Sequence, residues 1–181
     1  LLERHPEHVG HVVFHARVVP TRVGVPEYDR ELDMVRSIVG RINQRFGRSV
    51  DLEERQDRGG ALAELAAADV VLVNSVADGM NLVAKEAAVL GRPSALVLSR
   101  RAGAYEELAE GAIGIEPADV DETCEALHQA IRMPPAERET RARVMSDTVR
   151  AWTSRDQFRA VLDDLDEAGT EGRSLASPVA S

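Results

Sequence analysis

The sequence is short of several residue types, and each shortage excludes a class of protein. The single cysteine, Cys124, excludes an intrachain disulfide framework and a cysteine-based zinc site. Aromatic residues make up only 3% of the chain, so a core has to be built from Val, Leu, Ile and Ala. No apolar run reaches the roughly 18 residues that a membrane-spanning helix needs, and the first residues lack the apolar segment of a signal peptide. These shortages predict a cytoplasmic protein that does not bind a membrane.

Lysine is scarcer still, because Lys85 is the only one in the chain. The 22 Lys and Arg residues are outnumbered by 31 Asp and Glu residues, which gives a formal net charge of −9. Residues 1–60 are balanced, so the acidic excess lies in the rest of the chain. An acidic chain without a basic patch is not expected to bind nucleic acid.

At 181 residues, of which 44% are hydrophobic, the chain is long enough for one domain with a substantial core. We expect this domain over residues 1–168. A disordered tail is expected over residues 169–181, where Gly, Ser, Pro and Ala show no apolar period. The chain has no initial Met and opens on what reads as the end of a helix, so we expect it to be the C-terminal piece of a longer protein.

Strand and helix patterns alternate along the chain, which predicts an α/β fold with a parallel sheet flanked by helices. The segment 69–74 is an unbroken apolar run, typical of a strand whose two faces are both covered. Strands are expected over 12–19, 50–54, 69–74, 95–98 and 112–115, and helices over 1–8, 27–46, 61–67, 105–109 and 135–150, with further helices after the turn at 78–81, after Asp119 and around 158–165.

The segment 78–86 carries the strongest functional signal. A strand runs into a glycine turn at the start of a helix, and unpaired N–H groups at a helix N-terminus favour anions. Asp78 has no cationic neighbour in sequence, so its carboxylate is predicted to accept hydrogen bonds from ligand hydroxyls. Glu86 lies one and a half turns into the helix, within reach of a sugar ring. The alternative is an ordinary capped helix with a solvated Glu86.

Other candidates carry weaker signals. Arg22, alone in a loop with Pro and Gly, is usually a surface residue, and Arg100–Arg101 could contact phosphates or form a solvated pair. Four histidines lie near the N-terminus but cannot share one helix face, so no metal site is predicted from them: His5, His8, His11 and His15. The acidic run 163–166 is interpreted as a solvated helix face. The sequence contains no G-x-S-x-G, P-loop or G-x-G-x-x-G motif.

The segment Asp78-Gly79-Met80-Asn81-Leu82-Val83-Ala84-Lys85-Glu86 resembles the nucleotide-sugar motif of trehalose-6-phosphate synthases, the enzymes of glycosyltransferase family 20. Further segments resemble the family in order: 19–22 with 25–28, 40–43 with 46–47, 96–99, 102–104 with 107–108, and Pro117-x-Asp119. The similarity covers roughly residues 1–165. It implies the C-terminal Rossmann-like half of a GT-B fold, which binds the nucleotide sugar.

The resemblance also implies a reaction. Glucose would pass from UDP-glucose, or another nucleoside-diphosphate glucose, to glucose 6-phosphate, giving trehalose 6-phosphate with retained configuration and without a metal or other cofactor. No residue of this chain is assigned as the catalytic group. By position, Asp78, Gly79, Met80 and Asn81 would hold the donor sugar, the backbone at Asn81, Leu82 and Val83 would hold the diphosphate, Glu86 would bond the ribose, and Arg22 would reach the acceptor phosphate.

Two departures from the family pattern leave alternatives open. The family usually has Arg immediately before Asp-Gly, where this chain has Ala77. The N-terminal domain, with its phosphate-neutralising Arg and Lys, is expected to be a missing partner, so the isolated piece is expected to be inactive; a homo-oligomer is possible. The alternatives are a related synthase with another acceptor, such as one making glucosylglycerol phosphate or joining cyclitols, and a catalytically idle regulatory domain.

Overall fold

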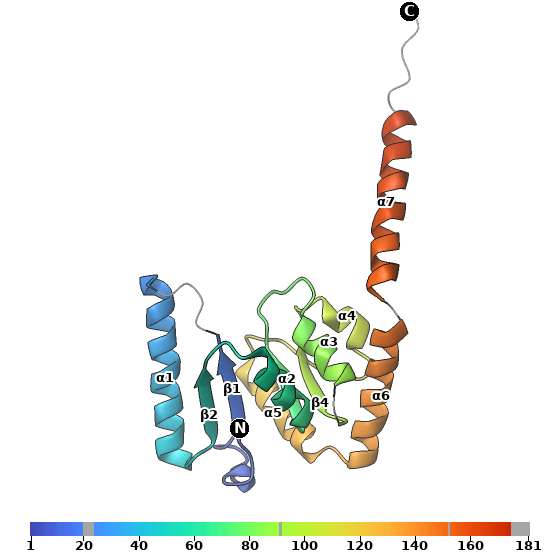
Figure 1. Ribbon diagram of the computed structural model, residues 1–181. Coiled ribbons are helices and arrows are strands. Elements are labelled where there is room, and N and C mark those ends of the chain that lie inside the picture. The colour runs from blue at the N-terminus through green and yellow to red at the C-terminus, as the bar shows by residue number, and fades with distance from the viewer. Residues whose placement is uncertain (20–23, 91, 152, 175–181) are drawn as a thin grey trace, which may run out of the picture.

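The computed structural model describes residues 1–19, 24–90, 92–151 and 153–174 (Figure 1). Strands and helices alternate through most of the chain, as the sequence pattern predicts. Their order is η1 (Pro6–His8), β1 (Phe14–Val18), α1 (Pro26–Phe46), β2 (Val50–Glu54), α2 (Arg58–Ala67), β3 (Val70–Val73), α3 (Leu82–Val89), β4 (Ala95–Ser99), α4 (Ala104–Leu108), β5 (Ile113–Ile115), α5 (Val120–Arg132), α6 (Pro135–Ala151) and α7 (Ser154–Ser174).

The strands form two parallel sheets, with the orders β1-β2 and β3-β4-β5. In the first sheet Phe14 pairs with Val50, and in the second Val70 pairs with Ala95. All three ladders are parallel, so the carboxyl ends of the strands within each sheet lie at one edge. In parallel α/β sheets this edge is where ligands bind.

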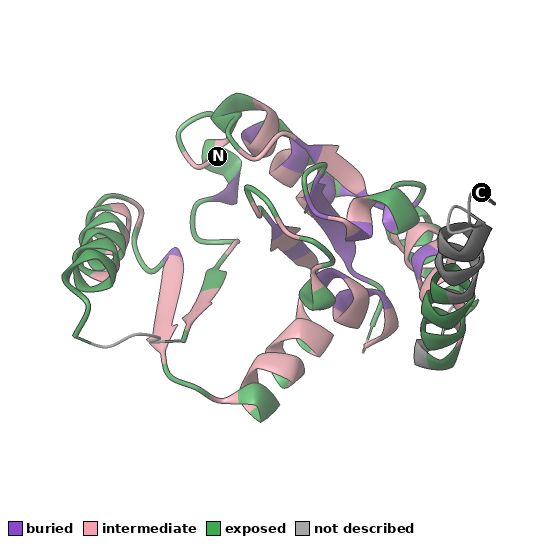
Figure 2. Cartoon of the chain, turned by 90° about the horizontal axis from the view of Figure 1, so that it is seen from above, coloured by how far each residue is buried: buried purple, intermediate pink, exposed green. Residues whose placement is uncertain are grey.

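The core lies in the three-stranded sheet, where every residue of β4 is buried. Complete burial of a side chain such as Leu98 contributes about 1.5–3 kcal/mol. On one face the buried residues belong mainly to α3, α4 and α6, and on the other they belong mainly to α5. Figure 2 shows this concentration of buried residues around the second sheet. β4 is therefore the rigid centre from which the neighbouring loops extend.

The first sheet is much more thinly covered. Neither β1 nor β2 contains a buried residue, and α1, although it spans 21 residues, buries none. The apolar face predicted for α1 contacts β2 and is only partly covered: Leu32 and Val39 are half-buried, whereas Ile38 is 40% exposed. Figure 1 shows α1 beside this small sheet.

Several predicted boundaries differ from the structure. The predicted helix over 1–8 is a turn followed by the short 3-10 helix η1, and the predicted strand over 12–19 shortens to β1. The predicted tail over 169–181 overlaps the end of α7, which runs to Ser174. Residues 175–181 lie outside the described part of the chain. In the described part, no helix is both long and apolar enough to cross a membrane.

Candidate functional site

Two loops meet at the carboxyl edge of the three-stranded sheet: residues 74–81, which follow β3, and residues 100–103, which follow β4. We call them the loop pair. The N–H of Gly103 donates to the carbonyl of Asp78 at 2.9 Å, and the N–H of Ala104 donates to the carbonyl of Met80 at 2.8 Å. Asp78 and Ala102 also form a parallel bridge. The loop that carries the predicted donor-binding residues is thus fixed to the end of the buried strand β4.

Two small residues, Gly103 and Ser99, permit the close approach of the two loops. A Cβ atom on Gly103 would lie 2.2 Å from the carbonyl oxygen of Gly79, although the backbone of Gly103 has the ordinary helical φ of −57°. The fully buried Ser99 donates its hydroxyl proton to the carbonyl of Ser75 at 2.7 Å and accepts from the N–H of Arg101 at 3.1 Å. Gly103 is therefore required for space, and Ser99 joins the two loops.

Asn81 is the N-cap residue that joins the loop after β3 to α3. It is the only residue other than glycine with a positive φ in the described part of the chain, at 68°. Asparagine tolerates this conformation better than most residues. Its side-chain oxygen accepts from the N–H of Ala84 at 3.0 Å and caps α3, while its side-chain nitrogen donates to Ser75 and to Asp78. Backbone strain of this kind is typical of functional sites.

Asp78 is not the open acceptor that the sequence suggested. Oδ1 accepts from the N–H of Met80 at 3.1 Å, and Oδ2 accepts from the side chain of Asn81 at 3.0 Å. These hydrogen bonds, that from Met80 first, lower the pKa of the Asp78 carboxyl below its usual range. The carboxylate stays ionised and shapes the loop, and only lone pairs not used by these two donors can face a ligand.

The N-terminus of α3 points into the loop pair. By helix geometry the N–H groups of Leu82 and Val83 have no acceptor within the helix, while that of Ala84 is capped by Asn81. The side chains of Leu82 and Val83 are 62% and 47% exposed, and Met80 and Gly79 are exposed beside them. This arrangement has the geometry that favours an anion at a helix N-terminus, and the binding itself stays a prediction.

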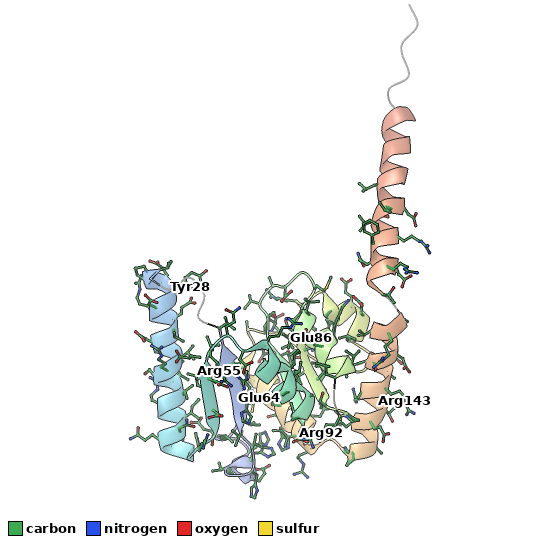
Figure 3. The ribbon with its side chains drawn as sticks, viewed as in Figure 1. Tyr28, Arg55, Glu64, Glu86, Arg92 and Arg143 are labelled. Atoms are coloured by element: carbon green, nitrogen blue, oxygen red, sulfur yellow. The ribbon has the colours of Figure 1, made fainter. Side chains whose placement is uncertain are left out.

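Glu86 lies on α3 facing α2, as Figure 3 shows. Its Oε1 accepts from the exposed guanidinium of Arg58 at 2.9 Å, and its side chain is 28% exposed. The alternative of a freely solvated Glu86 is therefore wrong, because Glu86 is half-buried and paired. Arg58 was not singled out from the sequence, in which it is simply one of many surface arginines at a helix start.

The other cations near the loop pair are neutralised by carboxylates. Lys85 pairs with both oxygens of Glu107, at 2.7 and 2.9 Å. Arg100 pairs with Glu122, which raises the pKa of the guanidinium and lowers that of the carboxyl, and Arg101 pairs with Glu116 at 2.9 Å. Contact with phosphates and a solvated pair were the alternatives predicted for Arg100–Arg101, and neither included the carboxylate partners that the structure shows. Arg22 lies outside the described residues.

A parallel α/β sheet with a capped helix mouth between two strand-end loops is the architecture of a Rossmann-like domain. Comparisons with known proteins narrow this class. A family model described as glycosyltransferase family 20 matches residues 1–167. The chain therefore belongs to glycosyltransferase family 20.

Relatives in this family support the assignment. The chain is 43% identical over 149 residues to a probable α,α-trehalose-phosphate synthase (UDP-forming) of Arabidopsis thaliana, covering 78% of this chain and 18% of the relative. It is 38% identical over 159 residues to a trehalose-6-phosphate synthase of Klebsiella pneumoniae, covering 83% and 33%. The chain thus spans about a third or less of the length of these relatives.

Solved structures show the same fold. The α,α-trehalose-phosphate synthase of Burkholderia xenovorans, solved with glucose-6-phosphate, is 37% identical with a TM-score of 0.79, over 83% of this chain and 34% of that one. The Escherichia coli protein bound to UDP-2-fluoro glucose is 32% identical with a TM-score of 0.85, over 91% and 38%. The predicted fold class is confirmed: this is a Rossmann-like domain of a GT-B glycosyltransferase.

Proposed function

We propose that the protein containing this chain transfers glucose from UDP-glucose, or another nucleoside-diphosphate glucose, to glucose 6-phosphate, and that this chain supplies the donor-binding half of the site. The family match over residues 1–167 carries the proposal. It is supported by relatives described as UDP-forming trehalose-phosphate synthases and by similar structures solved with glucose-6-phosphate and with UDP-2-fluoro glucose. The product is then trehalose 6-phosphate.

The geometry suggests what each part of the loop pair does. The N–H groups of Leu82 and Val83, backed by the α3 dipole, bind the diphosphate and stabilise the charge that develops as it leaves. Arg58 occupies Oε1 of Glu86, so Oε2 is the atom that we assign to the ribose hydroxyls. Asp78 and Asn81 hold the loop that surrounds the donor sugar.

Gly79 and Met80, which are both exposed, are assigned to the same sugar. We assign no residue of this chain as an acid or base, because Asp78 is ionised and committed to the loop. Catalysis then rests on positioning and on charge stabilisation. The proposal includes no metal or other cofactor at this site, and omission of Mg²⁺ should leave the transfer rate unchanged.

The binding site for the acceptor sugar phosphate lies mainly outside the loop pair. We assign Arg22 to the acceptor phosphate by its position in the family motif alone. A second domain is required to complete the cleft, since the described cations around the loop pair are already paired with carboxylates. The phosphorylated substrates favour a cytoplasmic location, and a homo-oligomer stays a prediction.

A catalytically idle domain is the second candidate, and Ala77 is the observation that favours it. This residue is exposed in the loop that follows β3, immediately before Asp78, where the resembling motif has an arginine. A synthase that uses another acceptor is the third candidate. Product analysis with glucose 6-phosphate, glycerol phosphate and cyclitol acceptors separates the three, because the idle domain makes no product.

The decisive experiment is calorimetric titration of UDP into the full-length protein and into its Glu86→Ala variant. Loss of hydrogen bonds to a charged group costs about 1.5–3 kcal/mol, so UDP affinity should fall roughly tenfold to a hundredfold. Glu139→Ala is the matched control, since Glu139 is an exposed carboxylate on α6, outside the loop pair. Absence of UDP binding by the unmutated protein would contradict the proposal.

A further inference from the structure

Three histidines from distant parts of the chain meet away from the loop pair. His5 and His8 belong to the turn around η1, and His128 lies on α5. The rings of His5 and His128 stack with centroids 3.7 Å apart and planes 15° apart. His8 Nε2 lies 3.0 Å from His128 Nδ1. Glu7, between the first two histidines in sequence, adds a carboxylate to this group, which we call the histidine cluster.

The distances within the histidine cluster fit one small cation. Oε1 of Glu7 lies 3.7 Å from Nδ1 of His5 and 3.9 Å from Nδ1 of His128. One ligand atom from each of these three residues lies within 4.8 Å of the others. A tetrahedral Zn²⁺ with bonds of about 2.0–2.1 Å holds its ligand atoms about 3.3 Å apart. The two contacts of Glu7 lie within about 0.6 Å of this spacing. The stacked rings of His5 and His128 have to turn so that both Nδ1 lone pairs reach the ion, and Nδ1 of His128 then exchanges its contact with His8 for the metal.

The surroundings also suit a metal centre. Nε2 of His5 lies 3.3 Å from Oε1 of Glu125, which leaves Nδ1 directed toward Glu7. A carboxylate on the far nitrogen of a ligating histidine fixes the ring orientation and increases its basicity. His8 is only 6% exposed and closes the inner side of the cluster, whereas Glu7 has a half-exposed side chain through which an ion can enter.

Two positive groups face the cluster and have to be weighed against a cation. The guanidinium of Arg4 pairs with Asp121 and lies 3.9 Å from Glu125, and Arg132 acts on His8 from the end of α5. Counted with these arginines, the carboxylates of Glu7, Glu125 and Asp121 still leave the region negative. Nearby charges therefore do not oppose binding of a divalent ion.

We infer that the histidine cluster is a site for a divalent transition-metal ion of the Zn²⁺ type, bound by His5, Glu7 and His128 and clasping the N-terminal turn onto α5. Imidazole with one carboxylate is a ligand set suited to zinc rather than to Mg²⁺ or Ca²⁺. The turn leads directly into β1, and α5 covers one face of the second sheet. The ion therefore joins the two sheets and takes no part in sugar transfer.

The test titrates Zn²⁺ into the chelator-treated, dialysed full-length protein by calorimetry, with Mg²⁺ as the hard-cation comparison. We expect one Zn²⁺ per chain, no heat from Mg²⁺ at the same concentrations, and a rise in Tm with Zn²⁺ alone. His128→Gln and the more exposed variant Glu7→Gln should each weaken Zn²⁺ binding at least tenfold. UDP affinity of both variants should equal that of the unmutated protein, which shows that they are folded.

His15→Gln is the matched control, because His15 is half-exposed and its Nδ1 lies 3.5 Å from a carboxylate, Asp51, outside the cluster. It should bind Zn²⁺ like the unmutated protein. Zn²⁺ binding that survives both His128→Gln and Glu7→Gln would overturn the assignment, as would no binding at micromolar Zn²⁺. A thiolate charge-transfer band with Co²⁺ would place the ion on the alternative group of His5, Cys124 and Glu125, and would equally overturn it.

Discussion

Replacing Gly103 with alanine should separate the two loops of the loop pair. The new Cβ would lie 2.2 Å from the carbonyl oxygen of Gly79, and ordinary contact begins at 3.4 Å, so the loops would have to move apart by about 1.2 Å. The obstacle is backbone, which has no rotamer by which to avoid the clash. The helical φ and ψ of Gly103 suit alanine, so the contact alone causes the effect.

The magnitude follows from the bonds that the movement stretches. The hydrogen bonds from Gly103 to Asp78 and from Ala104 to Met80, at 2.9 and 2.8 Å, would pass beyond hydrogen-bonding range. Each contributes about 0.5–1.5 kcal/mol, and overpacking adds about 1–3 kcal/mol. Alanine offsets about 0.4–1 kcal/mol of this loss, because it lowers the conformational entropy of the unfolded chain. A net loss of about 2–4 kcal/mol in the loop pair is expected, and UDP affinity should fall at least about tenfold.

Two other glycines give matched controls for the calorimetric UDP titration and the thermal unfolding of the full-length protein. Gly79→Ala lies in the same loop but meets nothing within 4 Å, and Gly40→Ala lies within α1, also in open space. Neither control should lower Tm. Gly79→Ala should stabilise the protein by about 0.4–1 kcal/mol, because alanine lowers the conformational entropy of the unfolded chain, and Gly40→Ala should stabilise it by up to about 1 kcal/mol, because alanine favours the helix. If Gly103→Ala binds UDP as tightly as Gly79→Ala, the close approach of the loops is not what forms the site.

Three further predictions concern the same region. Asn81→Ala loses the cap on Ala84 and places alanine at positive φ, so it should cost about 2 kcal/mol in denaturant unfolding, whereas Asn81→Gly, which tolerates that φ, should cost less; equal losses would contradict the role of φ. The pKa of Asp78 is lower in the folded protein than its ordinary value of 3.8, so the ionised carboxylate stabilises the fold at pH values above 3.8. This stabilisation is lost as the pH falls through the lower, folded pKa. Asp78→Asn should therefore show a shallower loss of Tm below about pH 4. Lys85→Met should lower the free energy of unfolding by no more than about 1 kcal/mol and leave UDP affinity unchanged. A tenfold loss of UDP affinity would show that Lys85 binds phosphate and does not only pair with Glu107.

Much of the second sheet could be predicted, because its signals are local. The apolar runs of β3 and β4 and the cap residue Asp119 of α5 fall where the sequence indicates, and Asp119 accepts from the N–H of Glu122 at 2.9 Å. The helix mouth at 78–86 is also visible from the sequence, because its turn and cap lie within a few residues of each other. Short-range patterns determine these features, so no contact partner has to be known in advance.

The remaining features depend on partners that are distant in sequence. Nothing near Asp78 indicates that Met80 and Asn81 use its carboxylate, and nothing near Glu86 indicates Arg58, which comes from the start of α2. The interpretation of the N-terminal histidines considered one helix face and could not include His128, which lies 120 residues further along the chain. The role of Ser99 was equally hidden, although a polar residue ending an apolar strand is a signal that could have been followed.

The pairing of cations with carboxylates around the loop pair has a consequence for the response to ionic strength. Lys85, Arg58, Arg100 and Arg101 are all matched by acidic partners, so this face of the described chain offers hydrogen-bond donors and a helix dipole but little net positive charge. Added salt screens long-range attraction between charges far more than it weakens short hydrogen bonds. Any steep dependence of nucleotide affinity on salt would therefore originate in the residues that complete the cleft, and this half would contribute shape and orientation at every ionic strength.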